Sequence, residues 1–467
     1  MNEQKILAIN VALRPHSNLK LFPVGLAYVL SSVKRAGYEF ELFDMDRLRP
    51  SEEEIQKKLA EKKWDVVLMG CIITGYPIVK KLVCEIRKTN KSAKIIVGNS
   101  VSSSIPDTFM ANIDADIGVV GEGDATIVEL LDCLTQGKDL STVKGIFYKS
   151  GNTLVKNEQR PVIADIDSIE RVDFSLFDME TYIESHRQMV TKIVPSGTES
   201  VRAFPVNTAR GCINSCTFCY HNFIGTKYRY RSARKIVDEI KFLNAKYGIN
   251  FALLWDDLTF FSKPQLEDFV DLLLEEKLDI KWTAAVRGNL FQDEGDKSLL
   301  LRVKESGCLQ LGYSLESANP EILKAMRKNM SLDEFRAQKN LLDEMGVATA
   351  TSIVLGYPQE TPETIAETFQ FCLDVKVFPS TGYLLPQPGT PIYVWAKDNG
   401  YIGDENEYLM NMGDRQDFRI NLTKMSSEEF EETVFSWLKK LNKEMGLNLD
   451  EALLIKTQYK QIQKPTE

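Results

Sequence analysis

The sequence predicts an α/β protein in which a doubly wound parallel sheet is followed by a second series of β/α units and a helical tail. Two observations support this fold class. Short apolar runs alternate with segments of helical spacing over about the first 135 residues, and again from Phe204 to Pro388. Such alternation is typical of parallel sheets covered by helices. A chain of 467 residues is also long enough for two or three domains.

In the N-terminal part, the apolar runs predict buried strands at Lys5–Val11, Val66–Ile73, Lys94–Gly98 and Asp116–Gly121. The segments between them predict helices at Gly25–Ala36, Ser51–Lys62 and Pro77–Lys88. Parallel sheets of this kind bind ligands in the loops that follow their strands. Those loops are residues 13–18, 70–75, 98–104 and 121–124. No G-x-G-x-x-G motif follows the first strand, which disfavours a nicotinamide cofactor.

The region from Ser141 to Pro205 has a different character. A hairpin-like turn at Lys149–Asn152 and several prolines predict a small β element and a connector. From Phe204 onward, strands are expected at Phe204–Ala209, Asn250–Asp256, Ile280–Val286, Leu309–Glu316, Ala348–Gly356 and Ser380–Gln387. Helices are expected at Ser232–Tyr247, Lys263–Glu275, Ser331–Met345 and Pro362–Val375. Six such units predict a full or partial barrel, whose chemistry lies at the carboxyl ends of its strands.

The tail, from about Gly400, is predicted to be mostly helical. Ser426 and Glu429 form a capping-box pattern at the start of a helix. The apolar side chains that follow share one helical face, which predicts packing against the rest of the protein: Phe430, Val434, Leu438, Leu441 and Met445.

Charge and composition narrow the function. The balance of 57 Lys and Arg against 66 Asp and Glu gives a net charge of −9, which argues against a nucleic-acid partner. No apolar run reaches the ~18 residues of a membrane span. The N-terminus has no secretion signal, so we expect a cytoplasmic protein with reduced thiols. Eight cysteines against three histidines favour cysteine-ligated chemistry.

The segment Arg210–Tyr220 reads R-G-C-I-N-S-C-T-F-C-Y and places Cys212, Cys216 and Cys219 within eight residues. Thiolates suit zinc or iron–sulfur centres. Structural zinc normally takes four ligands, and no fourth Cys or His lies at a suitable local spacing; the adjacent His221 would strain the loop. A [4Fe–4S] cluster held by three cysteines leaves one iron open to hold a substrate.

This C-x3-C-x2-C motif after a strand resembles the radical S-adenosylmethionine (SAM) superfamily. Further segments of the chain resemble the cobalamin-binding branch of this superfamily: Y-R-Y-R-S-A-R-K-I-V-D-E-I, L-L-W-D-D-L-T-F, G-Y-S-L-E-S-A, G-Y-P-Q-E-T, P-Q-P-G-T-P, P-V-G-L-A-Y-V-L and G-E-G-D-A-T. The resemblance covers about residues 1–400. It implies a cobalamin-binding, Rossmann-like domain (1–140), a small β element and connector (141–203), a partial (β/α)6 radical SAM barrel of the TIM type (204–398) and a helical C-terminal domain (399–467).

The resemblance also implies that Cys212, Cys216 and Cys219 hold three irons of the cluster and that SAM chelates the fourth. Reductive cleavage of SAM would then give a 5′-deoxyadenosyl radical that abstracts hydrogen from an unactivated carbon. The residues expected to contact SAM are Phe218, Tyr220, Asp256, Asp257, Arg287, Ser314 and Glu316. The two aspartates also fit an exposed acidic turn, and Arg287 also fits a surface ion pair. Gly356 and Pro358 are expected to shape the fifth loop.

For cobalamin, the resemblance points to Cys71, Thr74, Gly98, Ser100, Ser102, Glu122 and Gly123. Ordinary turn chemistry also explains Gly98, Ser100 and Ser102, and the family often has two glycines where this chain has Gly98–Asn99. The D-x-H-x-x-G pattern that supplies an axial histidine is missing, and His16 lacks its flanking pattern. No histidine is therefore expected to ligate cobalt, and Cys71 is expected to be a buried apolar side chain.

These features predict a cobalamin-dependent radical SAM enzyme that transfers a methyl group from methylcobalamin to an sp3 carbon of a small molecule or a peptide. An external donor such as flavodoxin or ferredoxin would supply electrons. The alternative is oxidative cyclisation or rearrangement, as in the anaerobic magnesium-protoporphyrin ester cyclase branch. A methylthiotransferase would need a second cluster on Cys71, Cys84 and Cys133, two of which lie at helical positions. A non-catalytic cobalamin carrier would need neither the cysteine motif nor the barrel.

Overall fold

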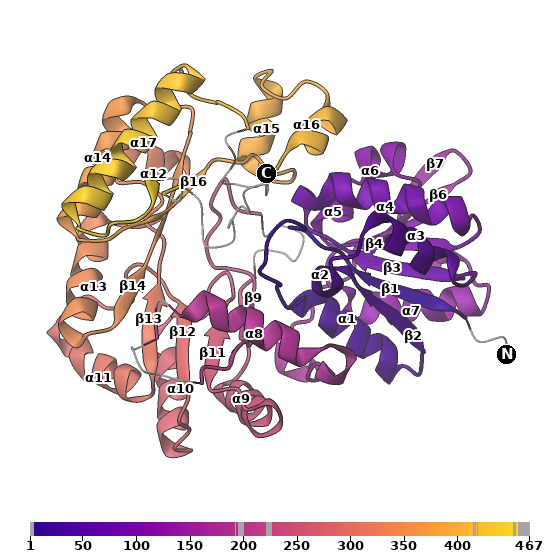
Figure 1. Cartoon of the computed structure of the whole chain (residues 1–467), viewed down its shortest axis with the longest axis horizontal. Helices are drawn as coiled ribbons and strands as arrows, with labels where there is room; N and C mark the ends of the chain where they lie inside the picture. The colour runs from indigo at the N-terminus through magenta and orange to yellow at the C-terminus, as the bar shows by residue number, and fades with distance from the viewer. Residues whose placement is uncertain are drawn as a thin grey trace.

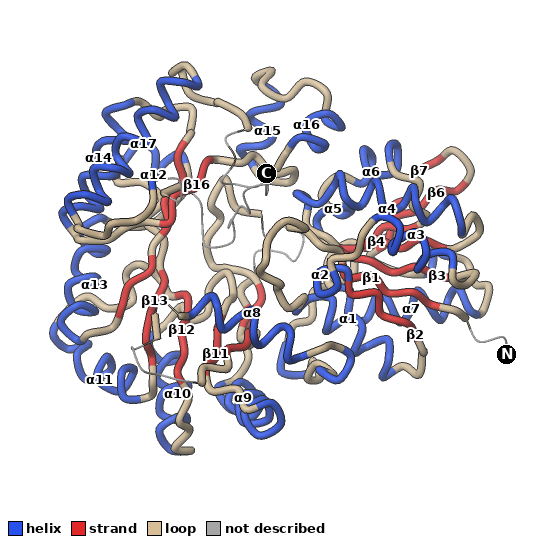
Figure 2. The backbone as a smooth tube through the Cα atoms, in the orientation of Figure 1, coloured by secondary structure: helices blue, strands red, loops and turns tan. Residues whose placement is uncertain are grey.

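The chain forms two α/β units that lie side by side, an N-terminal unit in indigo and purple and a second unit in magenta to yellow (Figure 1). The structure is a computed structural model that describes residues 4–191, 193–194, 200–220, 227–413, 417, 419–451 and 454–455. His221 lies outside these ranges. In both units the strands lie inside and the helices outside (Figure 2). Each unit is therefore a sheet covered by helices.

A seven-stranded sheet of order β2-β1-β3-β4-β5-β6-β7 forms the centre of the N-terminal unit. Neighbouring strands among the first five are parallel, as predicted. The strand β2, which the sequence reasoning missed, forms one edge. The strands are β1 (Ile6–Asn10), β2 (Phe40–Asp44), β3 (Val66–Gly70), β4 (Lys94–Gly98), β5 (Ile117–Val119), β6 (Ile146–Ser150) and β7 (Thr153–Lys156).

Helices cover both faces of this sheet because successive side chains of a strand point to opposite sides. Leu7 and Ile9 pack in one core with Val79 of α4, whereas Ile6 packs in another with Leu130 of α7. The doubly wound arrangement is thus confirmed. The helices of the unit are α1 (Val24–Arg35), α2 (Met45–Leu48), α3 (Glu52–Ala60), α4 (Tyr76–Thr89), α5 (Ser100–Ser103), α6 (Pro106–Asn112) and α7 (Gly123–Thr135).

The predicted hairpin is present, but it belongs to the N-terminal sheet. β6 turns into β7 through Gly151, which has a positive φ of 61°, and β6 pairs antiparallel with β5. Gly118 lies opposite Phe147 in this pairing, and a Cβ at Gly118 would lie 2.0 Å from the Phe147 ring. The sheet therefore continues to Lys156, past residue 140, where the sequence reasoning placed its end.

The second unit contains a parallel sheet of order β14-β13-β12-β11-β8. A further parallel pair, β15 and β16, is joined to it by a bridge between Glu316 and Ile353. The predicted fifth strand is interrupted at Thr351, so it appears as β14 and β15. The strands are β8 (Ala203–Pro205), β11 (Phe251–Leu254), β12 (Lys281–Ala285), β13 (Cys308–Gly312), β14 (Ala348–Ala350), β15 (Ser352–Leu355) and β16 (Ser380–Tyr383).

Helices follow the strands of this sheet and cover its outer side (Figure 1). They are α9 (Ala233–Tyr247), α10 (Lys263–Glu275), α11 (Lys297–Glu305), α12 (Pro320–Ala325), α13 (Leu332–Met345) and α14 (Pro362–Asp374). The four helices predicted in this region are all present within one or two residues of their expected ends. The parallel β/α arrangement of the second unit is confirmed.

An aromatic cluster packs the two units together through the connector. Phe22 precedes α1, and its ring centroid lies 4.9 Å from that of Phe177, 5.4 Å from that of Tyr182 and 4.8 Å from that of Phe204. Tyr182 belongs to α8 (Met179–Val190), and its hydroxyl donates a hydrogen bond of 2.8 Å to Asp44. The connector thus lies between the sheets and contributes to one continuous core.

The tail contains α15 (Pro391–Asp398), α16 (Glu405–Asn411) and α17 (Ser427–Glu444). Ser426 caps α17, because its hydroxyl accepts a hydrogen bond of 3.1 Å from the backbone N–H of Glu429. Trp437 of α17 stacks on Phe369 of α14 with centroids 6.2 Å apart. In α16, Asn406 accepts a hydrogen bond of 2.9 Å from the hydroxyl of Tyr76, so the tail also contacts the N-terminal unit. In the described part of the chain, no helix is both long and apolar enough to cross a membrane.

We expect Leu438→Ala to destabilise the second unit by about 2–5 kcal/mol, because it leaves a cavity in a core where Leu438 is fully buried. Ser436→Ala, at an exposed position of the same helix, is the matched control. Urea unfolding followed by tryptophan fluorescence measures both. Equal stability of the two variants would show that α17 does not pack on the barrel.

Candidate functional site

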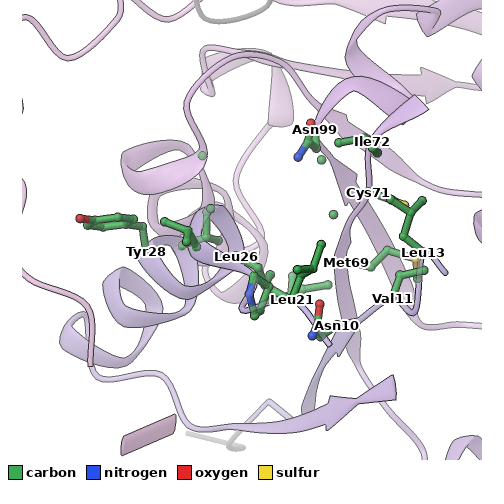
Figure 3. Close-up of a pocket in the computed structure, with 18 of the residues that line it drawn as sticks. Asn10, Val11, Leu13, Leu21, Leu26, Tyr28, Met69, Cys71, Ile72 and Asn99 are labelled. Atoms are coloured by element: carbon green, nitrogen blue, oxygen red, sulfur yellow. The ribbon is translucent and has the colours of Figure 1, made fainter. Parts of the chain in front are cut away.

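A pocket of about 500 Å³ opens at the carboxyl ends of the parallel strands of the N-terminal sheet (Figure 3). Asn10 at the end of β1, Met69 in β3 and Gly98 at the end of β4 line it. The second unit contributes Asn207 and Arg210 to its wall. The pocket therefore lies where doubly wound sheets bind ligands, and the second unit partly closes it.

Four of the seven residues predicted to contact cobalamin line this pocket: Cys71, Gly98, Glu122 and Gly123. Thr74, Ser100 and Ser102 are not among its lining residues. The hydroxyl of Ser100 accepts a hydrogen bond of 2.8 Å from the backbone N–H of Ile73, and that of Ser102 donates one of 2.9 Å to the carbonyl of Val97. Both serines are buried and hold the loops together, so their role in the structure is to shape the pocket's rim.

Ile72 and Asn99 line the pocket on these loops, and sequence reasoning missed both (Figure 3). Ile72 is 42% exposed, which is unusual for an isoleucine in a buried loop. Asn99 has a φ of 71° and a ψ of −172°, a backbone conformation that is essentially restricted to glycine. The loop therefore keeps a glycine-type conformation at Asn99, and this residue carries backbone strain at the pocket.

Cys71 lies in the pocket wall as a neutral thiol, because burial raises its pKa to about 12. Its sulfur also packs against Gly75, where a Cβ would lie 2.2 Å from it. Among the described residues, no histidine lines the pocket. His16 is exposed on the first loop, whereas His186 is buried in α8 with its Nδ1 2.6 Å from the carbonyl oxygen of Tyr182.

A buried cluster of charges joins this pocket to the cysteine loop. Glu122, just before α7, accepts hydrogen bonds from Arg210 at 2.8 Å and from Arg229 at 3.0 Å. Asp124 also pairs with Arg210, at 3.1 Å. Burial alone would lower the pKa of Arg210, but Asp124 and Glu122 raise it above its usual range. Because Arg210 lies two residues before Cys212, the predicted cofactor contact Glu122 also fixes the chain that leads into the cysteine motif.

A second pocket, of about 720 Å³, lies at the carboxyl ends of the strands of the second sheet. It is lined by the three motif cysteines and by six of the seven residues predicted to contact SAM: Phe218, Asp256, Asp257, Arg287, Ser314 and Glu316. The exception is Tyr220. Its ring lies against Gly389, and its hydroxyl interacts with Ser103 and Ser104 of the N-terminal unit. Tyr220 therefore packs between the units, because the loop turns away from the pocket after Cys219.

The three cysteines present their thiols to one pocket from a single loop. Burial raises the pKa of Cys216 and raises that of Cys219 to about 12, so these thiols are neutral until a metal displaces their protons. Within the described residues, no three His, Cys, Asp or Glu side chains form a site for a single metal ion. A set of three soft donors around one pocket fits an iron–sulfur cluster.

The two aspartates after β11 have different surroundings. The carboxylate of Asp256 accepts hydrogen bonds from the side chain of Asn207 and from the backbone N–H of Thr208, the latter at 2.9 Å. Burial raises the pKa of Asp256 to about 6. Asp257 is exposed, and its charge raises the pKa of the neighbouring Cys219 further. Asp256 therefore holds the chain before the cysteine motif, and Asp257 faces the pocket beside the motif.

Glu316 is buried in the segment after β13 with a φ of +63°, and its carboxylate accepts a hydrogen bond of 3.1 Å from Lys328. Lys328 lines the same pocket, and sequence reasoning missed it. Burial alone would lower the pKa of Lys328, but the charge of Glu316 raises it above its usual range. The pair satisfies the expectation that a buried glutamate at this strand end has a cationic partner.

Arg287 lines the pocket just after β12, and Gln338 donates a hydrogen bond of 2.9 Å to its backbone carbonyl. In the described part of the chain, no acidic side chain forms an ion pair with Arg287. Ser314 accepts a hydrogen bond of 3.1 Å from Ser352. The pocket thus holds a guanidinium that is available to a carboxylate ligand.

Two family models match the chain at these two pockets. The Radical SAM superfamily model matches residues 206–372, and the B12 binding domain model matches residues 11–131. The chain belongs to the B12-binding radical SAM family. It is a cobalamin-dependent radical SAM enzyme, and a [4Fe–4S] cluster, SAM and cobalamin are the typical cofactors of this family.

Relatives of this B12-binding radical SAM enzyme include proteins of different named activities. An uncharacterized methyltransferase of Pyrococcus horikoshii is 28% identical over 81% of this chain and 79% of its own length. The anaerobic magnesium-protoporphyrin IX monomethyl ester cyclase of Cereibacter sphaeroides is 26% identical over 83% of this chain and 62% of its own length. The radical SAM methyltransferase TsrM from Kitasatospora setae has the same fold, with a TM-score of 0.68, 18% identity and coverage of 86% of this chain and 77% of its own.

The loop after β15 contains Glu360, which is 1% exposed and accepts a hydrogen bond of 3.0 Å from the backbone N–H of Gly356. No basic side chain of the described residues pairs with it, and burial raises its pKa from 4.5 to about 7. Its carboxyl is thus protonated in the folded protein near pH 6 and ionised in the unfolded chain. The stability that this group contributes is present below pH 4.5 and is lost as the pH rises through 7.

We therefore expect Glu360→Gln to gain stability relative to the wild type as the pH rises from 4.5 to 8, by up to about 3 kcal/mol. Glutamine imitates the protonated carboxyl and does not ionise. The exposed Glu367→Gln on α14 serves as the control and should follow the wild type. Urea unfolding at pH 5 and pH 8 measures the difference. A pH-independent difference would contradict the raised pKa.

Proposed function

We propose that this chain is a C-methyltransferase that methylates an unactivated carbon of a small molecule or a peptide. The observation that carries the proposal is the pairing of the two pockets, with the residues Asn207–Arg210 between the N-terminal pocket and the cysteine loop. The names of relatives support it, because they include the methyltransferase of Pyrococcus horikoshii and the hopanoid C-3 methylase of Methylococcus capsulatus.

Each pocket supplies a different set of contacts in this proposal. The cluster with SAM supplies a 5′-deoxyadenosyl radical, and methylcobalamin supplies a methyl group. Cys212, Cys216 and Cys219 hold the cluster, and Arg287 binds the carboxylate of SAM with charge-assisted hydrogen bonds. Asp257 lies beside Cys219 and faces the amino group of SAM. In this family the cofactors carry the chemistry, and the side chains bind and orient them rather than act as acids or bases. The arrangement of these residues fits that role.

The remaining residues of the second pocket, called the barrel pocket below, line its walls. Phe218 packs edge-on against Tyr357, with ring centroids 6.4 Å apart, and presents an apolar surface for adenine. Ser314 and Glu316, in the segment after β13, would hold the ribose, and Lys328 keeps the Glu316 carboxylate in place. In the N-terminal pocket, Cys71, Ile72 and Leu13 provide apolar contacts for the corrin ring. Gly98, Asn99 and Gly123 allow close approach of the rest of cobalamin.

Radical SAM enzymes need an external reductant. We infer that a flavodoxin or a ferredoxin supplies the electron, and that the protein has no nucleic-acid partner, given its net charge of −9. The substrate enters between the two pockets in this proposal, since both reactive groups must reach it.

A cyclase is the second candidate, because the cyclase of Cereibacter sphaeroides is nearly as similar to this chain as the methyltransferase of Pyrococcus horikoshii. A methylthiotransferase with a second cluster is disfavoured. Cys71 packs in the core on one face of the N-terminal sheet and Cys133 in the core on the other face, whereas Cys84 is exposed on α4. These three thiols cannot reach one cluster. A carrier without catalysis would leave the barrel pocket unexplained.

We expect the triple variant Cys212→Ala, Cys216→Ala, Cys219→Ala to lose the iron–sulfur absorption after anaerobic reconstitution and to form no 5′-deoxyadenosine. It should still retain hydroxocobalamin, because none of the three cysteines lines the N-terminal pocket. Cys84→Ala, on the surface of α4, is the control and should behave as the wild type. A wild-type protein that incorporates the cluster but retains no hydroxocobalamin would overturn the proposed function.

The two candidate activities differ in what becomes of SAM. A methyltransferase that recharges its cobalamin from SAM releases S-adenosylhomocysteine together with 5′-deoxyadenosine, and its product is heavier by one methylene unit. A cyclase releases 5′-deoxyadenosine without S-adenosylhomocysteine. We expect both SAM products, with methyl-labelled SAM placing label in the organic product, measured by mass spectrometry. Label confined to SAM and methionine, with 5′-deoxyadenosine as the sole adenosyl product, would favour the cyclase.

A further inference from the structure

The residues Asn207–Arg210 form a wall of the N-terminal pocket and connect it to the barrel pocket, the second pocket described above. Asn207 and Arg210 line the N-terminal pocket. The side chain of Asn207 also donates a hydrogen bond to Asp256, which lines the barrel pocket. Arg210 is followed, after one glycine, by Cys212 of the barrel pocket. A ligand in the first pocket would therefore contact Asn207, which is hydrogen-bonded to a residue of the second pocket. It would also contact Arg210, which lies two residues before a cysteine of the second pocket.

The same charged residues hold the chain on both sides of the cysteine motif. Arg210 ends β9 (Ala209–Arg210) before the motif, and Arg229 begins β10 (Arg229–Tyr230) after it; the two short strands pair antiparallel. Both arginines bind the carboxylate of Glu122, whose side chain is only 4% exposed. Asp124 adds a second carboxylate for Arg210. Both ends of the motif are thus attached to the loop and first turn of α7 in the N-terminal unit.

We propose that the Asn207–Arg210 wall, held by Glu122 and Asp124, couples the two pockets, so that cobalamin in the N-terminal pocket tightens the binding of SAM in the barrel pocket. Arg210 and Asn207 are positioning residues in this proposal, and neither takes part in the chemistry. The proposal rests on the proposed function, since it names the ligands of both pockets.

The physical basis of the coupling is the ordering of one segment by two ligands. The first ligand to bind restricts the wall and the cysteine motif attached to it, so the second ligand loses less conformational entropy when it binds. The coupling is reciprocal, so SAM tightens cobalamin by the same factor. The buried ion pairs transmit this ordering from one pocket to the other, because moving one charged side chain out of the cluster would leave its partner buried and unpaired. Glu122, which serves both arginines, is the central member.

The test measures the affinity for SAM of the protein with its oxidised cluster, with and without saturating hydroxocobalamin. No reductant is added, so SAM is bound and not cleaved. In the wild type we expect hydroxocobalamin to tighten SAM by about fivefold or more. Arg210→Lys keeps the positive charge but cannot reach Glu122 and Asp124 together, and we expect its coupling factor to fall below about twofold.

The matched control is Arg160→Lys. Arg160 pairs with Glu129 and donates a hydrogen bond of 2.8 Å to Thr126, both on α7, but it makes no contact with the second unit among the described residues. We expect it to keep the wild-type coupling factor. Asn207→Ser removes the hydrogen bond to Asp256 without touching the ion pairs, so it tests the wall even if Arg210→Lys does not fold. It should also lose coupling.

A second measurement separates coupling from simple damage to the fold. Hydrogen exchange of the backbone over residues 207–220 should slow on addition of hydroxocobalamin in the wild type and in Arg160→Lys, and should respond less in Arg210→Lys. Unchanged coupling and exchange in Arg210→Lys and Asn207→Ser would overturn the proposal. Two ligands that bind the wild type independently would overturn it too, while leaving the proposed function intact. A wild type that binds no hydroxocobalamin would overturn both.

Discussion

The arrangement of the two pockets depends on one buried carboxylate, that of Glu122. Its two oxygens bind Arg210, Arg229 and the backbone N–H of Ile163, the last at 2.6 Å. Removing one partner from such a cluster is far more costly than replacing the whole cluster by apolar residues, because the other charges are left buried and unpaired. The cluster therefore joins the two units through buried charges that remain satisfied only while all partners stay in place. The aromatic contacts around Phe22 supply the burial that holds them together, and the ion pairs determine where the cysteine loop lies.

The order of strands and helices could be predicted from the sequence because local apolar periodicity encodes it. The sequence did not predict features that depend on pairing between residues far apart in the chain. β2 was missed because Glu41 and Asp44 interrupt the apolar character of Phe40–Asp44, which lies at the edge of the sheet. The hairpin Ile146–Lys156 was recognised but separated from its sheet, since only the distant pairing of β6 with β5 places it there. The fifth barrel strand was predicted as one run, and the break at Thr351 follows from the hydrogen bond of its hydroxyl to the carbonyl of Tyr313.

The site shows the same division between local and distant information. The three cysteines could be predicted because their spacing within one loop is itself the signal. Tyr220 is adjacent to the last cysteine, yet its direction is set by Gly389, which is remote in sequence. Ser100 has a hydroxyl of the right type for a ligand, but the backbone of Ile73 uses it. Lys328 could not be predicted, because in the sequence a single lysine twelve residues after Glu316 looks like any surface lysine. Only the fold shows that both side chains are buried.

The two pockets also divide the chemistry of the site by polarity. The barrel pocket contains charged groups at its walls, among them Arg287, Asp257 and the Glu316–Lys328 pair, which suit a zwitterionic ligand such as SAM. The N-terminal pocket is lined by apolar and small side chains, and its buried charges are already paired, as Arg210 is with Glu122. Such a pocket suits a large ring with little charge on its faces. The residues Asn207–Arg210 lie between the two pockets, and the charge of Arg210 is paired with Glu122. The pairing of Arg210 with Glu122 thus satisfies a buried charge and fixes the start of the cysteine loop beside the N-terminal pocket.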